Sequence, residues 1–416
     1  MNVGSPRGRH LLDADRAFAV GGGPLARAVA PAFQRVLDRV DAGLAEGAIE
    51  ATLPDGRTRL LGGRAPGPVA IVHLHNWMPL VRLILAGSVG WYRSWSLREW
   101  SSPDPVPLFD LFMRNRAPLG TTARARGLPR LLNRIRHFAR RNSRAGARRN
   151  IAAHYDLGND FYAAWLDQTM SYSSAIFAAA DEPLEVAQVR KQRALLDRLA
   201  LKPGDRLLEI GCGWGGLAAT AARDYGAAVH AITLSAEQKS WADRVTAGQP
   251  VEVTLTDYRD VQGRYDAVAS VEMVEAVGQA HWQDYMDAIA RALRPGGRAA
   301  IQYITIADDV FERYAGNVDF IQAYIFPGGL LISESRFAAA AERAGLEWRD
   351  RTGFGLDYAE TLRRWRIAFD AAAVEGRLPA GFDGRFVDLW RYYLMYCEGG
   401  FRGGGIDVAQ VTLVKR

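Results

Sequence analysis

Short apolar runs alternate with amphipathic stretches along the chain from about residue 150. Runs with the length and composition of buried strands lie at residues 206–210, 228–233, 251–255, 266–270 and 298–304. Between the first three of them, residues 217–224 and 236–243 have the character of helices. Strands that alternate with helices in this way indicate a doubly wound, Rossmann-like parallel sheet, and therefore the α/β fold class.

The first 120 residues have a different pattern of apolar, aromatic and proline residues. The apolar run 70–74 is followed by a cluster of tryptophans and a tyrosine, and the proline-rich stretch 101–107 leads as a loop into the apolar run 108–112. We expect a small α+β domain here. The most apolar stretch, residues 69–91, contains His73, Asn76 and Arg82, so it does not have the character of a membrane span.

The segment between these two zones is strongly basic. Ten arginines and no acidic residue lie from Arg124 to Arg149, with leucines at mixed spacings of three and four. An amphipathic helix that binds anionic lipid headgroups and a solvated linker both remain open. Nucleic acid is a weaker alternative, because no recognised nucleic-acid motif accompanies the charge. A chain of 416 residues is too long to fold around a single hydrophobic core. We therefore expect domains at 1–120 and 150–416, joined by the segment 121–149.

Composition narrows the class further. Hydrophobic residues make up 49% and charged residues 24%, which is ordinary for a folded protein, and the formal charge is +6. Cys212 and Cys397 alone suggest no disulfide framework, and the N-terminus has no apolar signal-peptide core. We therefore expect a cytoplasmic location. His73 and His75 have no cysteine or carboxylate cluster nearby, so no metal site is expected.

A glycine-rich stretch, Leu208-Glu-Ile-Gly-Cys-Gly-Trp-Gly-Gly216, lies between the first predicted strand and its helix. Gly211, Gly213 and Gly215 allow a tight turn and a close approach of the backbone to a ligand. Dinucleotide enzymes use a similar turn, but two features argue against a dinucleotide. Glu209 offers a carboxylate to a cationic amino group, and residues 233–238 replace the simple acidic residue that would bind a dinucleotide ribose.

Further blocks of characteristic residues follow one another in order. Two of them are Glu272-Met-Val-Glu-Ala-Val-Gly278 and Phe354-Gly-Leu-Asp-Tyr358. The others are residues 154–160, 170–175, 233–238, 257–260, 320–329, 392–402 and 406–407. Over most of residues 80–416 the chain thus resembles the cyclopropane-fatty-acyl-phospholipid synthase family. The resemblance implies a class I methyltransferase domain preceded by a small lipid-contacting domain, a homodimer, and peripheral association with the inner face of the membrane.

The resemblance also implies a reaction and its site. Family members transfer the methyl of S-adenosylmethionine to the cis double bond of an unsaturated phospholipid acyl chain, and bicarbonate then removes a proton as a cyclopropane ring closes. The implied bicarbonate cage is Glu275, Gln302, Tyr358 and the backbone of Ile304. The implied cofactor contacts are Tyr172, Ser173, Gly211, Gly213, Thr233, Gln238 and Asp257, to which the glycine-rich stretch adds Glu209 and Gly215.

Three positions depart from the family pattern. Ser174 stands where many members have cysteine, Gln302 where some have histidine, and Arg93 where an acidic residue is common. These departures affect what happens to the cation that methyl transfer leaves on the acyl chain, and therefore which product forms. They do not affect methyl transfer itself. The leading expectation is a cyclopropane. The alternative is a methyl-branched or methylated unsaturated chain, including furan fatty acid precursors. A small-molecule methyltransferase and a non-catalytic lipid-binding protein are weaker alternatives.

The chemistry requires a dry, electron-rich pocket and a base. An alkene attacked by a methyl cation equivalent leaves a carbocation, which water would trap. Aromatic side chains stabilise such a charge. The candidates are Tyr162, Trp165, Tyr172, Phe177, Tyr324, Phe326, Tyr392, Tyr393 and Phe401, although core packing is the ordinary role of each. Glu275 is the pivotal base candidate, with Asp257 and Asp357 as other available carboxylates.

Overall fold

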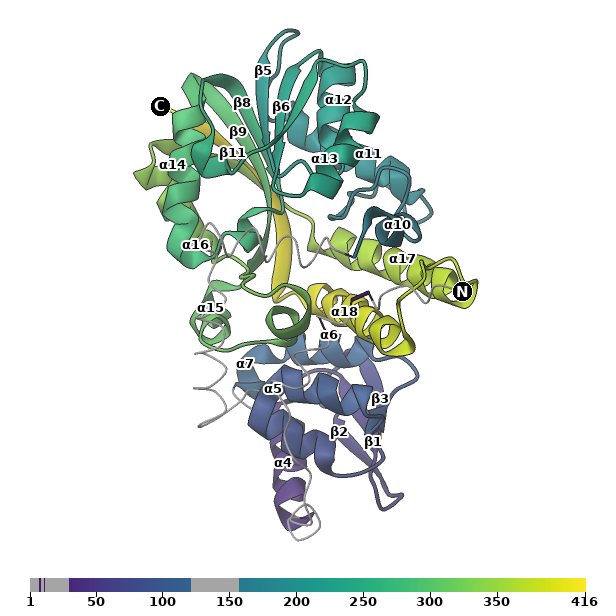
Figure 1. The fold of residues 1–416 in the computed structure, drawn as a ribbon. Coiled ribbons are helices and arrows are strands. Elements are labelled where there is room, and N and C mark those ends of the chain that lie inside the picture. Colours follow the sequence, from purple (N-terminus) through teal and green to yellow (C-terminus); the bar gives the residue numbers. More distant parts are fainter. Residues whose placement is uncertain (1–6, 9–10, 12–29, 121–156) are drawn as a thin grey trace. The chain divides into compact units, whose positions relative to one another are not determined.

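The computed structural model describes residues 7–8, 11, 30–120 and 157–416 (Figure 1). The chain divides into two compact units. One contains Met1–Arg140, Glu312–Pro327 and Ala380–Ile406, and the other contains Arg141–Phe311, Gly328–Pro379 and Asp407–Arg416. Two late segments thus group with the N-terminal part, while the predicted boundaries at 120 and 150 stay predictions. The basic segment Arg124–Arg149 and His154 lie outside the described residues.

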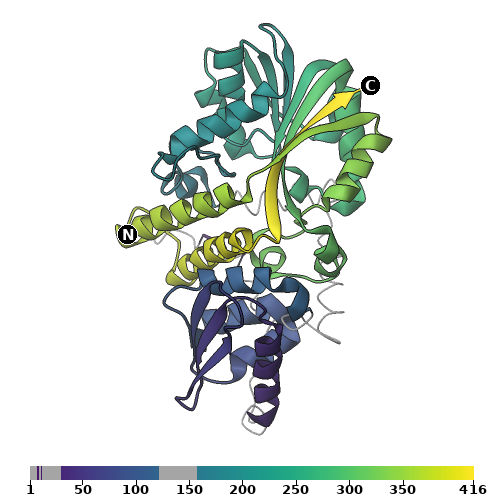
Figure 2. The ribbon, with the colours of Figure 1, turned by 180° about the vertical axis from the view of Figure 1, so that it is seen from behind.

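The N-terminal unit contains a four-stranded sheet with the order β2-β1-β3-β4. Its strands are β1 (Ala48–Thr52), β2 (Thr58–Gly62), β3 (Val69–Leu74) and β4 (Trp100–Ser101). Strand β1 is antiparallel to β2 and parallel to β3, and β4 is antiparallel to β3. Figure 2 shows this small sheet with helix α4 (Ala30–Gly43) beside it. The mixed sheet with its helices confirms the predicted α+β class of the N-terminal domain.

The other helices of this unit pack around aromatic side chains. They are α5 (Met78–Ser96), α6 (Val106–Arg114), α7 (Arg116–Leu119), the π-helix η4 (Ile321–Ile325) and α18 (Gly384–Arg402), while α15 (Asp308–Ala315) crosses the boundary between the units. The ring of Tyr92 lies 4.8, 4.6 and 4.9 Å from those of Phe320, Tyr324 and Tyr392. Two of the predicted pocket aromatics, Tyr324 and Tyr392, are therefore core residues of this unit.

The second unit contains a seven-stranded sheet with the order β10-β11-β9-β8-β5-β6-β7. Its strands are β5 (Arg206–Ile210), β6 (Ala228–Thr233), β7 (Val251–Leu255), β8 (Tyr265–Val271), β9 (Leu293–Ile306), β10 (Leu346–Gly353) and β11 (Ile406–Lys415). Strands β5 to β9 are the five predicted ones, and each pairs in parallel with its neighbours among them. Strands β10 and β11, an antiparallel pair, were not predicted.

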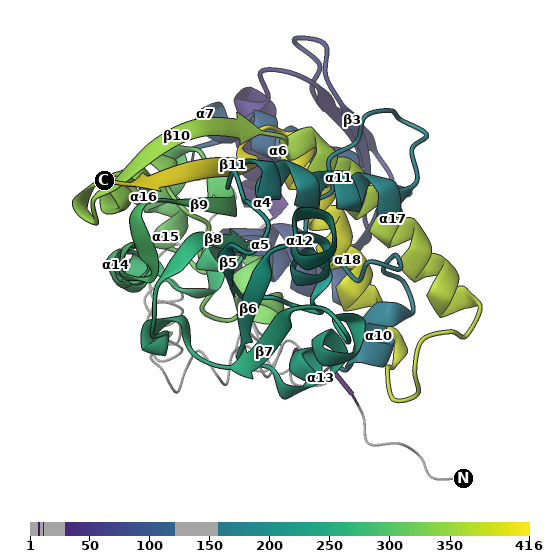
Figure 3. The same ribbon diagram turned by 90° about the horizontal axis from the view of Figure 1, so that it is seen from above.

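Helices cover both faces of this sheet, as Figures 1 and 3 show. On one face lie α11 (Leu184–Asp197), α12 (Gly216–Tyr225) and α13 (Ala236–Val245), and on the other lie α14 (Trp282–Ala292) and α16 (Glu334–Arg343). The remaining helices of the unit are α10 (Asn159–Ala163), α17 (Gly355–Val374), η1 (Tyr258–Asp260), η2 (Val274–Ala276) and η3 (Gln279–His281). Small and branched side chains fill the core under α11 and α12, among them Leu207, Ala218 and Val229.

The strand order fixes where a ligand can bind. From β5 the chain runs outward through β6 to β7, and it then returns to β8 on the other side of β5. Ligands of such sheets bind at the carboxyl ends of the strands, at this switch point. The doubly wound fold is as predicted. None of the helices in the described part of the chain is long and apolar enough to cross a membrane.

Candidate active site

The loop after β5 has a backbone conformation that favours glycine. Gly211, Gly213 and Gly215 have φ angles of 81°, 52° and 87°. A Cβ on Gly211 would lie 2.8 Å from the Met273 side chain, and one on Gly215 would lie 2.9 Å from Ala242. A Cβ on Gly213 would meet no atom within 4 Å among the described residues, apart from Gly213 itself and its two chain neighbours. The first and third glycines thus allow close packing, while Gly213 leaves space for a ligand beside the backbone.

Glu209 is buried at the end of β5, directly before this loop. Its Oε2 atom is buried and has no hydrogen-bond partner among the described residues. Burial raises the pKa of this carboxyl to about 8, while the charge of Lys191 acts in the opposite direction. A buried carboxylate oxygen without a donor is costly, and a ligand ammonium group would satisfy it. Glu209 and the space at Gly213 therefore fit S-adenosylmethionine, which carries such a group.

Three other predicted cofactor contacts lie at the same edge of the sheet. Thr233, at the end of β6, donates its hydroxyl to Gln238 Oε1 at 2.9 Å. The Ser235 hydroxyl caps α13 by accepting a hydrogen bond from the backbone N–H of Gln238 at 3.2 Å. Asp257 follows β7 and is buried in a bidentate ion pair with Arg259, at 2.8 and 2.6 Å. These contacts hold the three side chains in fixed orientations beside the glycine loop.

Ser173 and Ser174 precede the sheet in sequence and contact different partners. Lys191, buried on α11, donates its ammonium to the Ser173 hydroxyl. The Ser174 hydroxyl donates to the Ala175 carbonyl at 2.9 Å, and its backbone N–H donates to Glu272 Oε1 at 3.1 Å. Ser174 therefore contributes its backbone N–H, rather than its hydroxyl, to the carboxylate of Glu272.

Aromatic side chains surround Tyr172. Its ring lies 5.3 Å from Tyr162, 5.9 Å from Trp165 and 5.3 Å from Trp365. The Trp365 ring also lies 6.1 Å from that of Tyr358. Sequence analysis named Tyr162, Trp165 and Tyr172, but it missed Trp365 on α17. The π faces of such a group offer negative potential to a cation.

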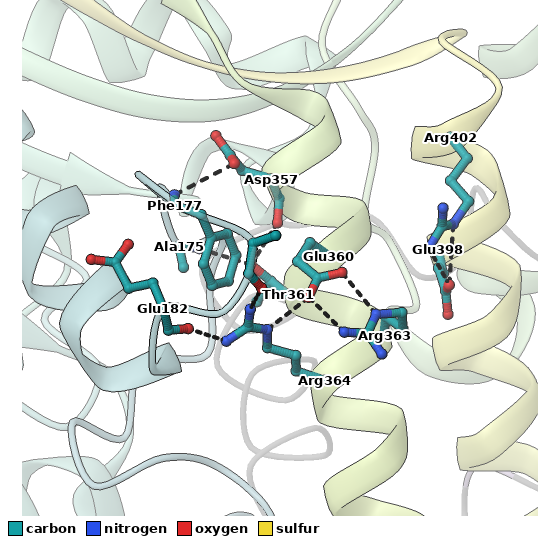
Figure 4. A network of polar contacts seen from close by, with 11 residues as sticks. Ala175, Phe177, Glu182, Asp357, Glu360, Thr361, Arg363, Arg364, Glu398 and Arg402 are labelled. Atoms are coloured by element: carbon teal, nitrogen blue, oxygen red, sulfur yellow. Dashed lines mark hydrogen bonds and ion pairs between the residues drawn. The ribbon is translucent and has the colours of Figure 1, made fainter.

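The chain between Ser174 and α11 is fastened to α17, as Figure 4 shows. The backbone N–H of Ala175 donates to the Thr361 hydroxyl at 3.1 Å, and that of Phe177 donates to Asp357 at 3.4 Å. These contacts hold the serine segment against the helix that carries Tyr358. Asp357, one of the alternative base candidates, is therefore engaged in fastening this segment.

Glu272 is the centre of the hydrogen-bond network, although sequence analysis gave it no role of its own. Its Oε1 atom accepts from Gln302 Nε2 at 2.6 Å and from the Ser174 amide, and its Oε2 atom accepts from the Tyr358 hydroxyl at 2.7 Å. Its backbone N–H donates to the Gln302 carbonyl at 2.8 Å. Gln302 and Tyr358, two residues of the implied bicarbonate cage, thus donate to a carboxylate of the protein itself.

A relay of side chains orients Gln302. Arg198 Nε donates to Gln410 Oε1 at 3.3 Å, and Gln410 Nε2 donates to Gln302 Oε1 at 3.0 Å. A guanidinium only donates hydrogen bonds, so it sets the direction of both amides. Gln302 must therefore direct its N–H groups toward Glu272. Both glutamines are buried, so the N–H group of Gln302 needs an acceptor within the protein. The Glu272 carboxylate is such an acceptor.

Glu275 lies three residues after Glu272 in the chain, on η2. Its Oε1 atom accepts from the backbone N–H of Ile304, and its Oε2 atom is buried without a partner in the described part of the chain. Burial and the neighbouring Glu272 raise the pKa of Glu275 to about 8. Burial also raises the pKa of Glu272, but Lys191 and three hydrogen-bond donors oppose this effect. Burial and the charge of Glu272 thus favour the neutral form of Glu275, whereas Lys191 and the three donors favour the charged form of Glu272.

Sequence analysis missed five residues of the hydrogen-bond network and the aromatic group: Glu272, Lys191, Arg198, Gln410 and Trp365. For Lys191 the chain does carry a signal. Gln188, Lys191 and Gln192 are buried polar residues at helical spacing on α11, where a soluble helix normally presents apolar side chains to its core. Polar residues on the buried face of a helix indicate a polar site beneath it.

The carboxyl of Glu275 makes folding stability dependent on pH. Its pKa of about 8 lies above the ordinary glutamate value of 4.5, so the folded protein binds more protons than the unfolded chain between these values. Stability therefore falls as pH rises through this window. We expect Glu275→Gln to remove this loss. The free energy of unfolding of the variant, relative to that of the native protein, should therefore be higher at pH 9 than at pH 5, by on the order of 2–4 kcal/mol. Denaturant unfolding at both pH values measures the difference.

Glu185→Gln, on the exposed surface of α11, is the control for the same substitution. It should change stability equally at the two pH values. A Glu275→Gln variant whose stability relative to the native protein is the same at pH 5 and pH 9 would show that Glu275 is not a neutral buried acid.

Comparisons with known proteins agree with this geometry. The family model described as mycolic acid cyclopropane synthetase matches residues 142–411. The tuberculostearic acid methyltransferase of Mycobacterium tuberculosis is 39% identical over 97% of this chain and 96% of its own length. The cyclopropane-fatty-acyl-phospholipid synthase of Escherichia coli is 40% identical over 62% of this chain and 66% of its own.

A solved structure also matches. The mycolic acid cyclopropane synthase CmaA1, complexed with SAH and CTAB, has a TM-score of 0.61 and 30% identity, and it covers 64% of this chain and 98% of its own. The predicted resemblance, the class I methyltransferase fold and the dependence on S-adenosylmethionine are thus confirmed. This chain belongs to the mycolic acid cyclopropane synthetase family, whose members include the cyclopropane-fatty-acyl-phospholipid synthases, and it is an S-adenosylmethionine-dependent methyltransferase.

Proposed function

We propose that this enzyme methylates the cis double bond of an unsaturated acyl chain in a phospholipid. The observation that carries the proposal is that one unit brings together the open glycine loop, the aromatic group around Tyr172 and the buried carboxylate of Glu272. When bound, S-adenosylmethionine supplies an electrophilic methyl group. The names of the relatives, which refer to fatty acyl and mycolic acid substrates, support a lipid acceptor.

The side chains around the glycine loop have different roles in the reaction. Glu209 and the backbone at Gly213 hold and orient the cofactor, which provides the rate advantage of proximity. Tyr172 and Trp365 stabilise the positive charge that develops on the acyl chain, and they exclude the water that would trap it. A carboxylate in the same network accepts the proton that must then leave.

Two products follow from the same methyl transfer. A cyclopropane is the first expectation, and the E. coli relative is named as a synthase of such chains. A methylated chain without a ring is the second candidate, and it is favoured by one observation. The relative that matches over 97% of this chain, and so over both units, is named a methyltransferase.

Bicarbonate, which the family resemblance implies, does not fit the residues as they are arranged. The side-chain donors of the implied cage, Gln302 and Tyr358, are bonded to Glu272, and the Ile304 amide is bonded to Glu275. We therefore assign no step of the reaction to bicarbonate.

We also propose that the enzyme works as a homodimer at the inner face of the membrane, with the basic segment Arg124–Arg149 on anionic headgroups. The mass of the protein in dilute solution tests the dimer. The ten arginines of this segment, with no acidic residue among them, support its role in docking, because the acyl substrate is itself part of a bilayer.

The reaction is tested directly with vesicles. Incubation with unsaturated phospholipid vesicles and methyl-labelled S-adenosylmethionine should transfer label to the acyl chains. Mass spectrometry of the released fatty acids then separates a cyclopropane from a methylated alkene, and vesicles of saturated phospholipid are the control. Label that appears with a small amine or phenol but never in unsaturated lipid would contradict the proposal.

The glycine loop is tested by Gly213→Ala. The added methyl group enters the space that the cofactor would occupy, so affinity for S-adenosylmethionine should fall by about tenfold or more, a loss of ~1.4 kcal/mol. Gly204→Ala is the matched control, because Gly204 also has a positive φ, 87°, and open space around it. Both variants should lose about 1–2 kcal/mol of stability from the backbone conformation. Calorimetry that shows equal affinity in the two variants would remove Gly213 from the site.

The basic segment is tested through salt. If its arginines bind anionic headgroups, binding to anionic vesicles should weaken steeply as salt rises, because the surface potential is screened. Replacement of Arg134, Arg136, Arg140 and Arg141 by glutamine should weaken binding to anionic vesicles but not to neutral ones.

The matched control is a variant with four exposed arginines elsewhere replaced by glutamine. They are Arg57, Arg223, Arg291 and Arg349. This control keeps the same net charge as the test variant. Equal loss of vesicle binding in the two variants would show that net charge, rather than the segment, attracts the membrane.

A further inference from the structure

The donors that would hold an external anion in this site all end on carboxylates of the chain. Tyr358 and Gln302 donate to Glu272 at 2.7 and 2.6 Å, and the Ile304 amide donates to Glu275. The Ser174 amide adds a third hydrogen bond to Glu272. The Glu272 carboxylate therefore stands where the donors of the implied cage converge.

A second anion has no favourable place beside this carboxylate. Two like charges in a buried site repel strongly, and the charge of Glu272 already helps to raise the pKa of Glu275. An external anion would have to displace Glu272 from at least two short hydrogen bonds. The site thus contains its own anion.

The backbone at Glu272 shows that this placement is specific. Its φ angle is 49°, in the left-handed region that favours glycine and is uncommon for glutamate. Such a conformation is unfavourable for residues other than glycine, and it persists where the surroundings hold it. Here the Glu272 amide donates to the Gln302 carbonyl at 2.8 Å, so strand β9 holds both the backbone and the carboxylate.

The carboxylate also lies close to the proposed cofactor loop. The next residue, Met273, packs against Gly211, since a Cβ on that glycine would lie 2.8 Å from the Met273 side chain. Tyr358, which donates to Glu272, neighbours Trp365 of the aromatic group. Glu272 is thus adjacent both to the loop that holds the methyl donor and to the side chains that face the cation.

We propose that Glu272 is a built-in base that replaces external bicarbonate in this enzyme. The inference rests on the proposed function. The alkene π pair forms the new bond to the methyl carbon while the bond from sulfur to methyl breaks, with its electron pair left on sulfur. A positive charge remains on the acyl chain. Glu272 then accepts a proton from one of two positions. If the proton comes from the new methyl group, the C–H electron pair bonds to the cationic carbon and closes a ring; if it comes from a carbon next to the charge, the electron pair forms a double bond.

The first test uses the native enzyme. Methylation of unsaturated phospholipid vesicles is measured in CO2-free buffer and after bicarbonate is added back. We expect the same rate in both, because the base is part of the chain. A rate that falls in CO2-free buffer and returns with bicarbonate would overturn the inference while leaving the proposed function intact. Absence of lipid methylation in both buffers would instead contradict the proposed function.

The second test uses two variants of one residue. Glu272→Gln keeps the shape but removes the charge, and Glu272→Gly removes the side chain at a backbone position that glycine adopts without strain. Both should lose activity by about 10²–10⁴-fold, the usual contribution of a general base. Bicarbonate or formate should restore part of the activity in Glu272→Gly only, because glutamine still fills the space.

Binding and backbone controls separate a base from a structural role. Calorimetry should show that both variants still bind S-adenosylmethionine. Ala200→Gly is the backbone control, because Ala200 also has a positive φ, 52°, and lies outside the hydrogen-bond network. This variant should keep native activity without added bicarbonate. Native-like activity in Glu272→Gln would overturn the inference. So would a Glu272→Gly variant that binds the cofactor but gains nothing from either anion. If Glu272→Gly does not fold, the native enzyme and Glu272→Gln still decide.

Discussion

A carboxylate removed from water must be given hydrogen-bond donors or a positive charge, and this requirement shapes the centre of the larger unit. Glu272 receives donors from a tyrosine, a glutamine and a backbone amide. Lys191, which burial makes easier to deprotonate, provides the compensating charge. The same requirement explains why Arg198 and Gln410 align the Gln302 amide, and why burial favours the neutral form of Glu275.

The donors come from distant parts of the chain. Ser174 precedes the sheet, Glu272 follows β8, Gln302 lies on β9, Tyr358 lies on α17 and Gln410 lies on β11. The carboxylate therefore has all its donors only when the Ser174 segment, β9 and α17 have come together, and the relay that orients Gln302 is complete only when β11 has joined the sheet. A partly folded unit would hold a buried charge with missing donors, which costs several kcal/mol. Formation of the site and completion of the fold are for this reason coupled.

The sequence predicted those features that local pattern determines. Strands β5 to β9 were found because each is a short apolar run, and the glycine loop because its residues allow unusual backbone angles. Strand β10 was missed because it is an edge strand with charged, largely exposed side chains. Glu272 was missed because its importance depends on a left-handed φ and on donors up to about 100 residues away, and neither leaves a local pattern. The cage residues were inferred from resemblance, and the candidate carboxylates for the base were Glu275, Asp257 and Asp357, so Glu272 was not considered.

An internal base changes what can determine the product. A free anion can shift within its cage, but the Glu272 carboxylate is fixed by three hydrogen bonds and by its own backbone. Which C–H bond it reaches then depends on how the acyl chain lies against it. A proton taken from the new methyl group while the carbon beside the methyl-bearing carbon is cationic closes a ring. A proton taken from the methyl group after a hydride shift has moved the charge to the methyl-bearing carbon gives an alkene. Ser174, through its backbone N–H, and Gln302, through its amide, both fix the position of Glu272. The Gln302 departure therefore acts on the product by placing the base, whereas a cysteine at position 174 would offer the same backbone N–H as Ser174. Methyl transfer depends on the separate glycine loop.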